Sequence, residues 1–187
     1  LEKTGARVNS IAIVSENIFN PENPEENRWL HRLANTWHVT TKPEVIRTQL
    51  LFEPGDQYNR QVVEESERLL RSNRYLREAD IVATNYENGA VDLEVQTSDV
   101  WTLSPSVSFG RKGGKNTGGI GLKEHNLFGT GRSIGIGYKS KVDRDTLSLK
   151  YFDRNFLSSR YQLTGEYTNA SDGFAELFQL ERPFFAL

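Results

Sequence analysis

Apolar and polar residues alternate along most of the second half of the chain, which is the period of a β-strand with one wetted face. The clearest stretch runs from Gly119 to Tyr138 and reads GIGLKEHNLFGTGRSIGIGY. Two short alternating runs flank the segment Asn126–Gly131, so we predict a hairpin there. The pattern by itself fits a strand pair of a soluble sheet as well as the wall of a membrane barrel.

The pattern before residue 98 is different, because helical and strand periods follow one another. Strands are predicted over residues 7–18, 79–86 and 91–97, with Asn88-Gly89 as a hairpin turn between the last two. Helices are predicted over residues 23–37, from Thr41 to 51 or 52, and from Asn59 to about 73.

Local signals mark where these helices begin and which side they bury. Thr41 and Glu44 have the spacing of a capping box, in which each side chain bonds a backbone amide of the first turn. The third helix begins at Asn59, and Asn73 lies where it should end. Its expected inner face is Val62, Ser66, Leu69 and Leu70. We expect Glu64–Arg68 and Glu67–Arg71 ion pairs on its outer face.

After Asp99 the helical period disappears and glycine becomes frequent. Six alternating segments follow, beginning with Trp101–Phe109 and ending near Leu180. The sequence therefore predicts an α+β protein in two parts: a β-α-α-β-β domain with an extra helix over residues 7–98, and about six antiparallel strands over residues 99–187.

Composition narrows the classes of function. The net charge is −2 and no basic stripe is present, so nucleic acid is not expected as a partner. The mean hydropathy is −0.59, and no apolar run approaches the ~18 residues of a membrane-spanning helix. Cysteine is absent, which excludes disulfides and thiolate chemistry, and methionine is absent, which indicates a processed or excised piece.

No catalytic or metal-binding motif stands out. His31 and His38 lie seven residues apart on a predicted helix without an HExxH pattern, which argues against zinc. His125 lies beside Glu124 near a turn, where a polar pair is the simpler interpretation. The Gly-rich segments, such as Gly129-Thr-Gly131, precede no helix that could bind a phosphate. We therefore expect no enzyme, no cofactor and no metal.

The whole chain from about residue 8 resembles outer-membrane proteins of the barrel-assembly superfamily, of the BamA and TamA type, in which polypeptide-transport-associated (POTRA) domains precede a barrel. The resemblance rests on the β-α-α-β-β order and on three segments of the second part. These segments are Asp99–Leu103, Glu124–Gly131 and Tyr151–Phe156. The extra helix within residues 19–40 departs from the ordinary POTRA pattern.

The resemblance implies a bacterial outer-membrane protein with residues 1 to about 98 in the periplasm. Its function would be assembly of outer-membrane proteins or translocation of polypeptides, with unfolded client chains, outer-membrane lipid and accessory periplasmic proteins as partners. One alternative is a secretion pore dedicated to one passenger protein, and another is a soluble β-sandwich that binds a ligand. The sequence does not name the client or the direction of transport.

Two candidate sites follow. In a β-α-α-β-β sheet we expect the last strand inside and the strand 79–86 at an edge, where unpaired backbone groups could bind an extended client. The expected client-binding residues are Ile81, Val82, Ala83, Thr84 and Asn85.

In the second part, one face of the strands should meet lipid and the other a polar interior. The expected lipid-facing residues are Ile120, Leu122, Ile134, Ile136, Tyr138, Leu147, Leu149 and Tyr151. The expected interior residues are Lys139, Lys141, Lys150, Arg160 and Glu166. About six strands are fewer than the ~8 that membrane barrels need, so we expect this piece not to close alone and to self-associate through open strand edges.

Overall fold

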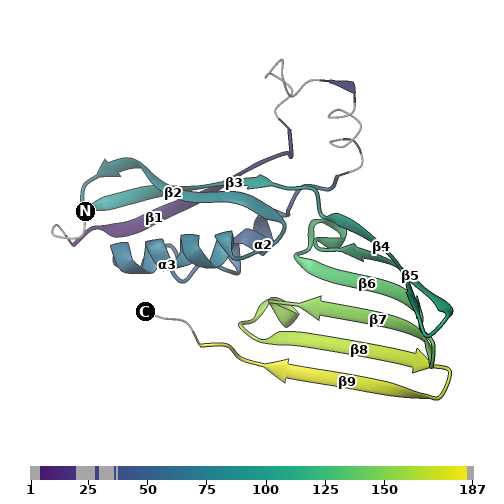
Figure 1. Cartoon of the computed structure of the whole chain (residues 1–187). Coiled ribbons are helices and arrows are strands. Elements are labelled where there is room, and N and C mark those ends of the chain that lie inside the picture. The colour runs from purple at the N-terminus through teal and green to yellow at the C-terminus, as the bar shows by residue number, and fades with distance from the viewer. Residues whose placement is uncertain (1–4, 20–27, 30–35, 37, 185–187) are drawn as a thin grey trace. The chain divides into compact units, whose positions relative to one another are not determined.

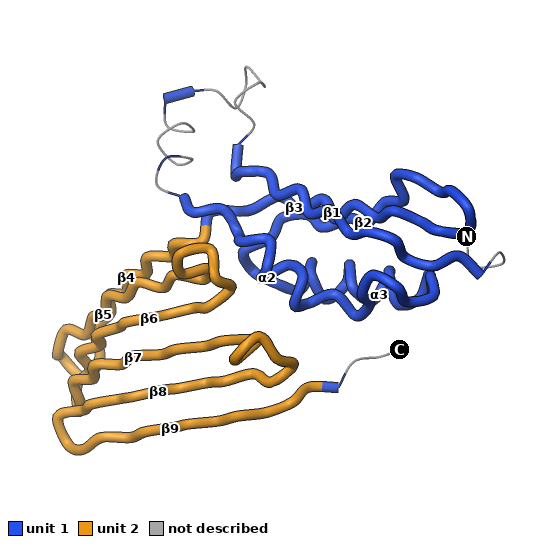
Figure 2. Tube along the Cα trace, turned by 180° about the vertical axis from the view of Figure 1, so that it is seen from behind, with its two compact units in different colours: residues 1–101, 184–187 blue, residues 102–183 orange. Residues whose placement is uncertain are grey.

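The computed structural model describes residues 5–19, 28–29, 36 and 38–184 of the 187-residue chain. The chain divides into two compact units, residues 1–101 with 184–187, and residues 102–183 (Figure 2). Most of the helix expected over residues 23–37, including His31, lies outside the described residues.

The first unit is a three-stranded sheet covered on one face by two helices (Figure 1). Its elements are β1 (Arg7–Glu16), α2 (Pro43–Arg47), α3 (Arg60–Arg71), β2 (Leu76–Glu87) and β3 (Ala90–Asp99). The strand order is β1-β3-β2, with β1 parallel and β2 antiparallel to β3. The last strand is thus central and β2 forms an edge, as the hairpin argument predicts.

Apolar side chains of the sheet and the two helices form the core of this unit. Ile46 of α2, Leu70 of α3 and Val95 of β3 are completely buried. Burial of one such side chain contributes roughly 1.5–3 kcal/mol. At the hairpin, Asn88 and Gly89 have φ of 52° and 79°, the left-handed values that a type I′ turn requires.

Helix α3 begins where the sequence predicts, but the face that it buries differs slightly from the predicted one. The Asn59 side chain accepts hydrogen bonds from the amides of Gln61 and Val62. The buried residues include Val63, whereas Val62 and Leu69 are only half-buried. A helix with 3.6 residues per turn places Val63, Ser66 and Leu70 on one side, and these three are buried.

Two local predictions in this region are wrong. Helix α2 ends at Arg47 rather than at residue 51 or 52, and its N-cap is Lys42 with no side-chain cap hydrogen bond. The capping box fails because the Thr41 hydroxyl donates to Asp99 instead, at 3.0 Å.

One of the two predicted ion pairs of α3 forms, and the other does not. The pair between Arg71 and Glu67 forms at 3.0 Å, but Glu64 pairs with Arg60 and Arg68 pairs with Glu65, each at 2.6 Å.

The second unit is one antiparallel sheet in which each strand pairs with the next in sequence (Figures 1 and 2). Its strands are β4 (Leu103–Lys112), β5 (Lys115–Glu124), β6 (Arg132–Ser140), β7 (Asp145–Asp153), β8 (Gln162–Ala170) and β9 (Gly173–Glu181). Because β4 does not pair with β9 in the described residues, the sheet is open. The six strands form one sheet instead of two packed layers, which contradicts the sandwich alternative.

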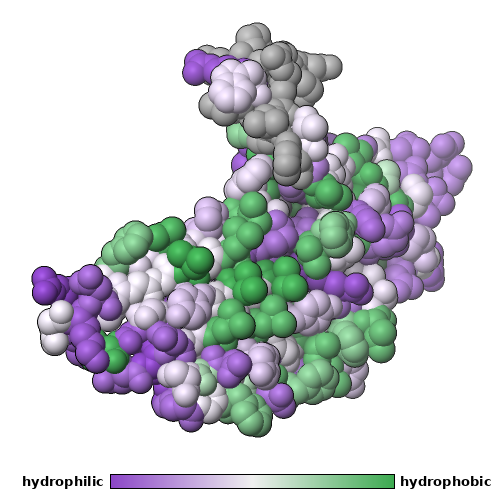
Figure 3. All heavy atoms as spheres, turned by 90° about the vertical axis from the view of Figure 1, so that its right-hand side faces the viewer, coloured by the Kyte–Doolittle hydropathy of each residue, from purple (hydrophilic) through white to green (hydrophobic). Residues whose placement is uncertain are grey.

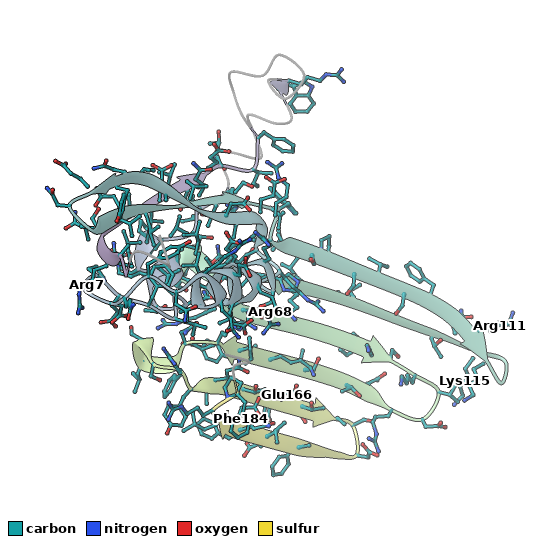
Figure 4. The ribbon with its side chains drawn as sticks, turned by 90° about the vertical axis from the view of Figure 1, so that its left-hand side faces the viewer. Arg7, Arg68, Arg111, Lys115, Glu166 and Phe184 are labelled. Atoms are coloured by element: carbon teal, nitrogen blue, oxygen red, sulfur yellow. The ribbon has the colours of Figure 1, made fainter. Side chains whose placement is uncertain are left out.

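Two kinds of turn connect these strands. The β4–β5 turn is formed by Gly113 and Gly114, with φ of 57° and 79°, and Arg111 and Lys115 lie beside it (Figure 4). At the opposite end of the strands, β5 connects to β6 through the 3₁₀ turn η2 (Leu127–Gly129), and β7 connects to β8 through η3 (Phe156–Ser158). None of the described helices is long and apolar enough to span a membrane.

Candidate functional site

All five residues of the expected client-binding edge, Ile81–Asn85, lie on strand β2, which is at an edge of the sheet. Strand β3 occupies the other side of β2, pairing Ile81 with Val95 and Ala83 with Leu93. An edge strand offers unpaired amides and carbonyls on every second residue. Among the described residues, the topology therefore leaves backbone groups of β2 without a strand partner.

Two side chains of α3 cover the beginning of this edge. Glu67 Oε1 accepts a hydrogen bond from the Ile81 amide at 2.8 Å, and Arg71 Nε donates to the Ala79 carbonyl at 2.8 Å. Arg71 also bonds Glu67 at 3.0 Å and Asp80 at 2.8 Å. We call this arrangement the Glu67–Arg71 clasp. It occupies one acceptor and one donor of the edge much as a neighbouring strand would, so the Ile81 amide is not open to a client in this structure.

Beyond the clasp, the sheet carries a bulge on each side of Asp92. The register shifts between Ala83 and Asn85 on β2 and between Val8 and Ser10 on β1, leaving Thr84 and Asn9 as the extra residues. Bulges bend a strand and increase its twist, which limits how far a regular ladder can extend along the edge. The unclasped regular part of the expected site is therefore short.

Polar side chains hold this double bulge in place. Asp92 Oδ1 accepts hydrogen bonds from Ser10 Oγ at 2.6 Å and Asn9 Nδ2 at 2.7 Å, and Asn85 Nδ2 lies 3.3 Å from Oδ2. The hydrogen bonds from Ser10 and then Asn9 stabilise the carboxylate, and they lower the pKa of Asp92 below its ordinary value. Asp92 thus joins all three strands on the exposed face.

The opposite edge, strand β1, is covered at its start. The loop after α2 pairs with it, because the Val8 amide donates to the Asp56 carbonyl at 2.9 Å and the Gly55 amide donates to the Val8 carbonyl at 2.7 Å. Arg47 reaches the Ile11 carbonyl at 3.2 Å.

A buried carboxylate anchors the segment before α2 to the end of β3. Asp99 is fully buried and its Oδ2 accepts hydrogen bonds from the Thr41 amide at 2.8 Å and the Thr41 hydroxyl at 3.0 Å. The ring Nε2 of His38 lies 2.8 Å from the same oxygen. This histidine, weighed above as a zinc ligand, faces one carboxylate, and no group of three potential metal ligands occurs among the described residues.

The strand register of the second unit brings all eight expected lipid-facing residues onto one face of the sheet. Directly paired residues share a face, and the pairs run Ile120–Tyr138–Leu147 in one row and Leu122–Ile136–Leu149 in the next. Ile134 pairs with Tyr151 in a third row. The face continues onto β4 and onto the last two strands through Val107, Leu163, Tyr167, Phe174, Phe178 and Leu180.

Many of these side chains are exposed, including Ile120 at 65% and Phe178 at 75%. Exposed hydrophobic side chains also form broad patches on the side of the molecule drawn in Figure 3. Asn169 and Glu176 interrupt the apolar face on β8 and β9. An exposed apolar face of this extent is typical of a surface that another apolar phase covers.

The opposite face of the sheet is polar. Lys150 of β7 bonds Glu166 of β8, which Figure 4 labels, at 2.7 Å, and the strand register places Lys139 on the same face. Glycine at position 121 leaves room for the side chain of Ser106 on the neighbouring strand β4, because a Cβ on Gly121 would lie 2.8 Å from Ser106 Oγ. Of the other expected interior residues, Lys141 lies in the turn after β6 and Arg160 lies just before β8.

The structure also shows a feature that the sequence reasoning missed: η2 and η3 belong to two copies of one turn, which we call the twin turns. The first spans Glu124–Arg132 and the second Asp153–Tyr161, at the same end of the sheet (Figure 1). In each, the acidic residue accepts a hydrogen bond from the amide two residues later, at 2.8 Å for Asn126 and 3.0 Å for Asn155. The signal is present in the sequence, since Glu-x-Asn-Leu-Phe-Gly-Thr and Asp-x-Asn-Phe-Leu-Ser-Ser match position by position.

An apolar residue occupies the tip of each twin turn. Phe128 and Leu157 both have a φ of 54°, which ordinary side chains rarely adopt, at a cost of roughly 1–2 kcal/mol each. They are 69% and 78% exposed. An ion pair at 3.0 Å between Arg132, at the end of the first turn, and the buried Asp153, at the start of the second, links the two. The ion pair thus joins the two turns that carry the exposed tips.

With this geometry in hand, the first unit is a POTRA-type domain and the second has the strand arrangement of an outer-membrane barrel. Residues 38–98 match the family model described as "Surface antigen variable number repeat", the POTRA family. This match spans the two helices and the last two strands of unit 1, in agreement with the POTRA domain that the resemblance of the sequence predicts.

Two solved structures share this fold. One is BamA from Haemophilus ducreyi lacking POTRA domains 1–3, with a TM-score of 0.64 and 17% identity over 88% of this chain. The other is CdiB from Acinetobacter baumannii, with a TM-score of 0.57 and 16% identity over 89% of this chain. The chain spans 27% and 28% of the lengths of these two proteins. No curated protein matches it.

Proposed function

We propose that this protein acts in the assembly of outer-membrane proteins or in the secretion of polypeptides through the outer membrane. The observation that carries the proposal is the succession of a POTRA domain and an antiparallel sheet with one largely apolar face. The first unit works in the periplasm, and the sheet is part of a barrel wall whose apolar face meets lipid. The fold of BamA and CdiB supports this arrangement.

Unit 1 binds unfolded clients through the edge of β2. An extended client adds a strand there, and its backbone hydrogen bonds give affinity with little preference for sequence. The clasp holds the Ile81 amide, so the client pairs first with the part of the edge from Val82 to Asn85. Since residue 81 directs its amide away from β3, the amide of Ala83, two residues on, also points outward.

Proline at Ala83 tests this edge without disturbing the ladder to β3. The substitution removes one outward amide, and proline is tolerated on the free side of an edge strand. The client is a labelled peptide that copies residues 145–153, a strand of the chain's own sheet. Its affinity for the full chain carrying Ala83→Pro should fall about 2–10-fold, the worth of one lost hydrogen bond of roughly 0.5–1.5 kcal/mol.

Ser15→Pro on β1 is the matched control, because it lies on the opposite edge of the same sheet. It should leave the affinity unchanged. Equal binding by Ala83→Pro and the unmodified chain, together with weaker binding by Ser15→Pro, would move the site to β1. A panel of unrelated unfolded polypeptides then separates the two functions, since general assembly predicts similar affinities and dedicated secretion predicts one preferred passenger.

A further inference from the structure

We propose that the twin turns are a membrane-interface anchor, which places Phe128 and Leu157 in the boundary between lipid headgroups and acyl chains. This inference rests on the proposed function, because it requires the sheet of unit 2 to lie in a bilayer. It adds a contact surface that the strand pattern alone does not assign, at the end of the sheet where the chain enters β4.

The first argument is that each turn is built to expose its tip. In the first, Gly131 donates to the Asn126 side chain at 2.7 Å, and Thr130 Oγ1 donates to the Leu127 carbonyl at 2.6 Å. In the second, Asn155 Nδ2 donates to the Ser159 carbonyl at 3.2 Å. These bonds hold polar groups of each turn within the turn itself, whereas the apolar tips Phe128 and Leu157 are exposed.

The second argument is that the polar residues around the tips have the charge of a headgroup contact. The acids Glu124 and Asp153 both accept hydrogen bonds from amides of their own turns. Arg132 pairs with Asp153 at 3.0 Å, and the two turns together carry three arginines, Arg132, Arg154 and Arg160, against these two acids. Apolar tips beside a net positive charge match an interface in which the phosphates of anionic lipids lie just outside the acyl chains.

The third argument is position. The apolar face of the sheet runs up to this end, since Ile134 and Tyr151 form the row of that face beside the turns. Tyr161, which follows the second turn, is 44% exposed and lies 6.0 Å from the Arg182 guanidinium. Aromatic and basic residues at the limit of an apolar band are typical of the level of the headgroups.

The chain has no cysteine, so single-cysteine variants can be labelled with a polarity-sensitive fluorophore without background. The test uses the full chain in vesicles of phosphatidylethanolamine and phosphatidylglycerol, with labels at Phe128→Cys or Leu157→Cys. Leu149→Cys reports the apolar face itself, and Glu87→Cys in the hairpin of unit 1 reports a water-exposed site. Circular dichroism verifies that each variant keeps its strand content.

We expect labels at 128 and 157 to be quenched at least 2-fold more by lipids with a quencher near the headgroup than by aqueous iodide. The label at 87 should respond to iodide only. If the label at 149 is quenched by deep lipid quenchers while the labels at 128 and 157 respond to iodide alone, the anchor is refuted but the proposal of a sheet in the membrane is supported. If 149 also responds to iodide alone, the membrane sheet and the anchor both fail. Shielding of 128 and 157 from both quenchers refutes lipid as the occupant and indicates a protein contact.

Discussion

Removal of the Asp99 side chain is the sharpest test of how unit 1 is held together. Asp99→Ala takes away the acceptor of two Thr41 donors and the partner of His38 Nε2, all within 3.0 Å of one oxygen. A hydrogen bond to a charged group contributes roughly 1.5–3 kcal/mol, but bonds that share one atom do not add. Loss of the acceptor also costs the desolvation of buried donors, roughly 1–3 kcal/mol, so we expect a total loss of about 3–4 kcal/mol.

The neighbouring residue supplies a control with the opposite expectation. The Ser98 hydroxyl is buried, and it has no hydrogen-bond partner among the described residues. Ser98→Ala therefore removes an unsatisfied polar atom and should be neutral or stabilising by up to about 1 kcal/mol. The two substitutions remove buried polar groups at adjacent positions of the same strand end.

Hydrogen exchange on the full chain measures both effects, because it resolves unit 1 from unit 2. In Asp99→Ala the slowest amides of β3 should exchange on the order of 10²–10³-fold faster, which corresponds to about 3–4 kcal/mol. In Ser98→Ala they should exchange at the original rate or more slowly. A change below 5-fold in Asp99→Ala, or an equal acceleration in both variants, would refute the assignment of Asp99 as the anchor of residues 38–41.

Two further predictions concern the sheet of unit 1. The lowered pKa of Asp92 means that its contribution to stability is present above the ordinary value of about 3.9 and is lost as the pH falls through the folded-state pKa. Urea unfolding at pH 6 and pH 3 should therefore show a smaller loss of stability for Asp92→Asn than for the unmodified chain, and equal losses would contradict this. Gly89→Val puts a β-branched side chain at a φ of 79°, which should cost about 1–2 kcal/mol by the same unfolding assay. Because a Cβ at Gly89 would meet nothing within 4 Å, a larger loss would indicate a contact that the structure does not show.

Local signals in the sequence predicted what local physics decides. The alternation of Ile134, Ile136 and Tyr138 determines which side of β6 is apolar, since successive side chains of a strand point to opposite faces. Asn88-Gly89 correctly predicted the β2–β3 turn, and Asn59 correctly predicted the start of α3. Both features depend on the conformations and hydrogen bonds of adjacent residues. The order of the elements then led to the POTRA-type domain and the barrel-type strands.

The tertiary structure decided what depends on residues far apart in the chain. Thr41 has the spacing of a helix cap, yet its hydroxyl bonds Asp99, 58 residues away, because the fold brings a buried carboxylate within 3.0 Å. Likewise, the pattern of β2 marks an edge strand, but only the packing of α3 shows that Glu67 already holds the Ile81 amide. The sequence by itself determined the elements and their apolar faces, whereas the structure decided which polar groups are satisfied, because their partners come from other elements.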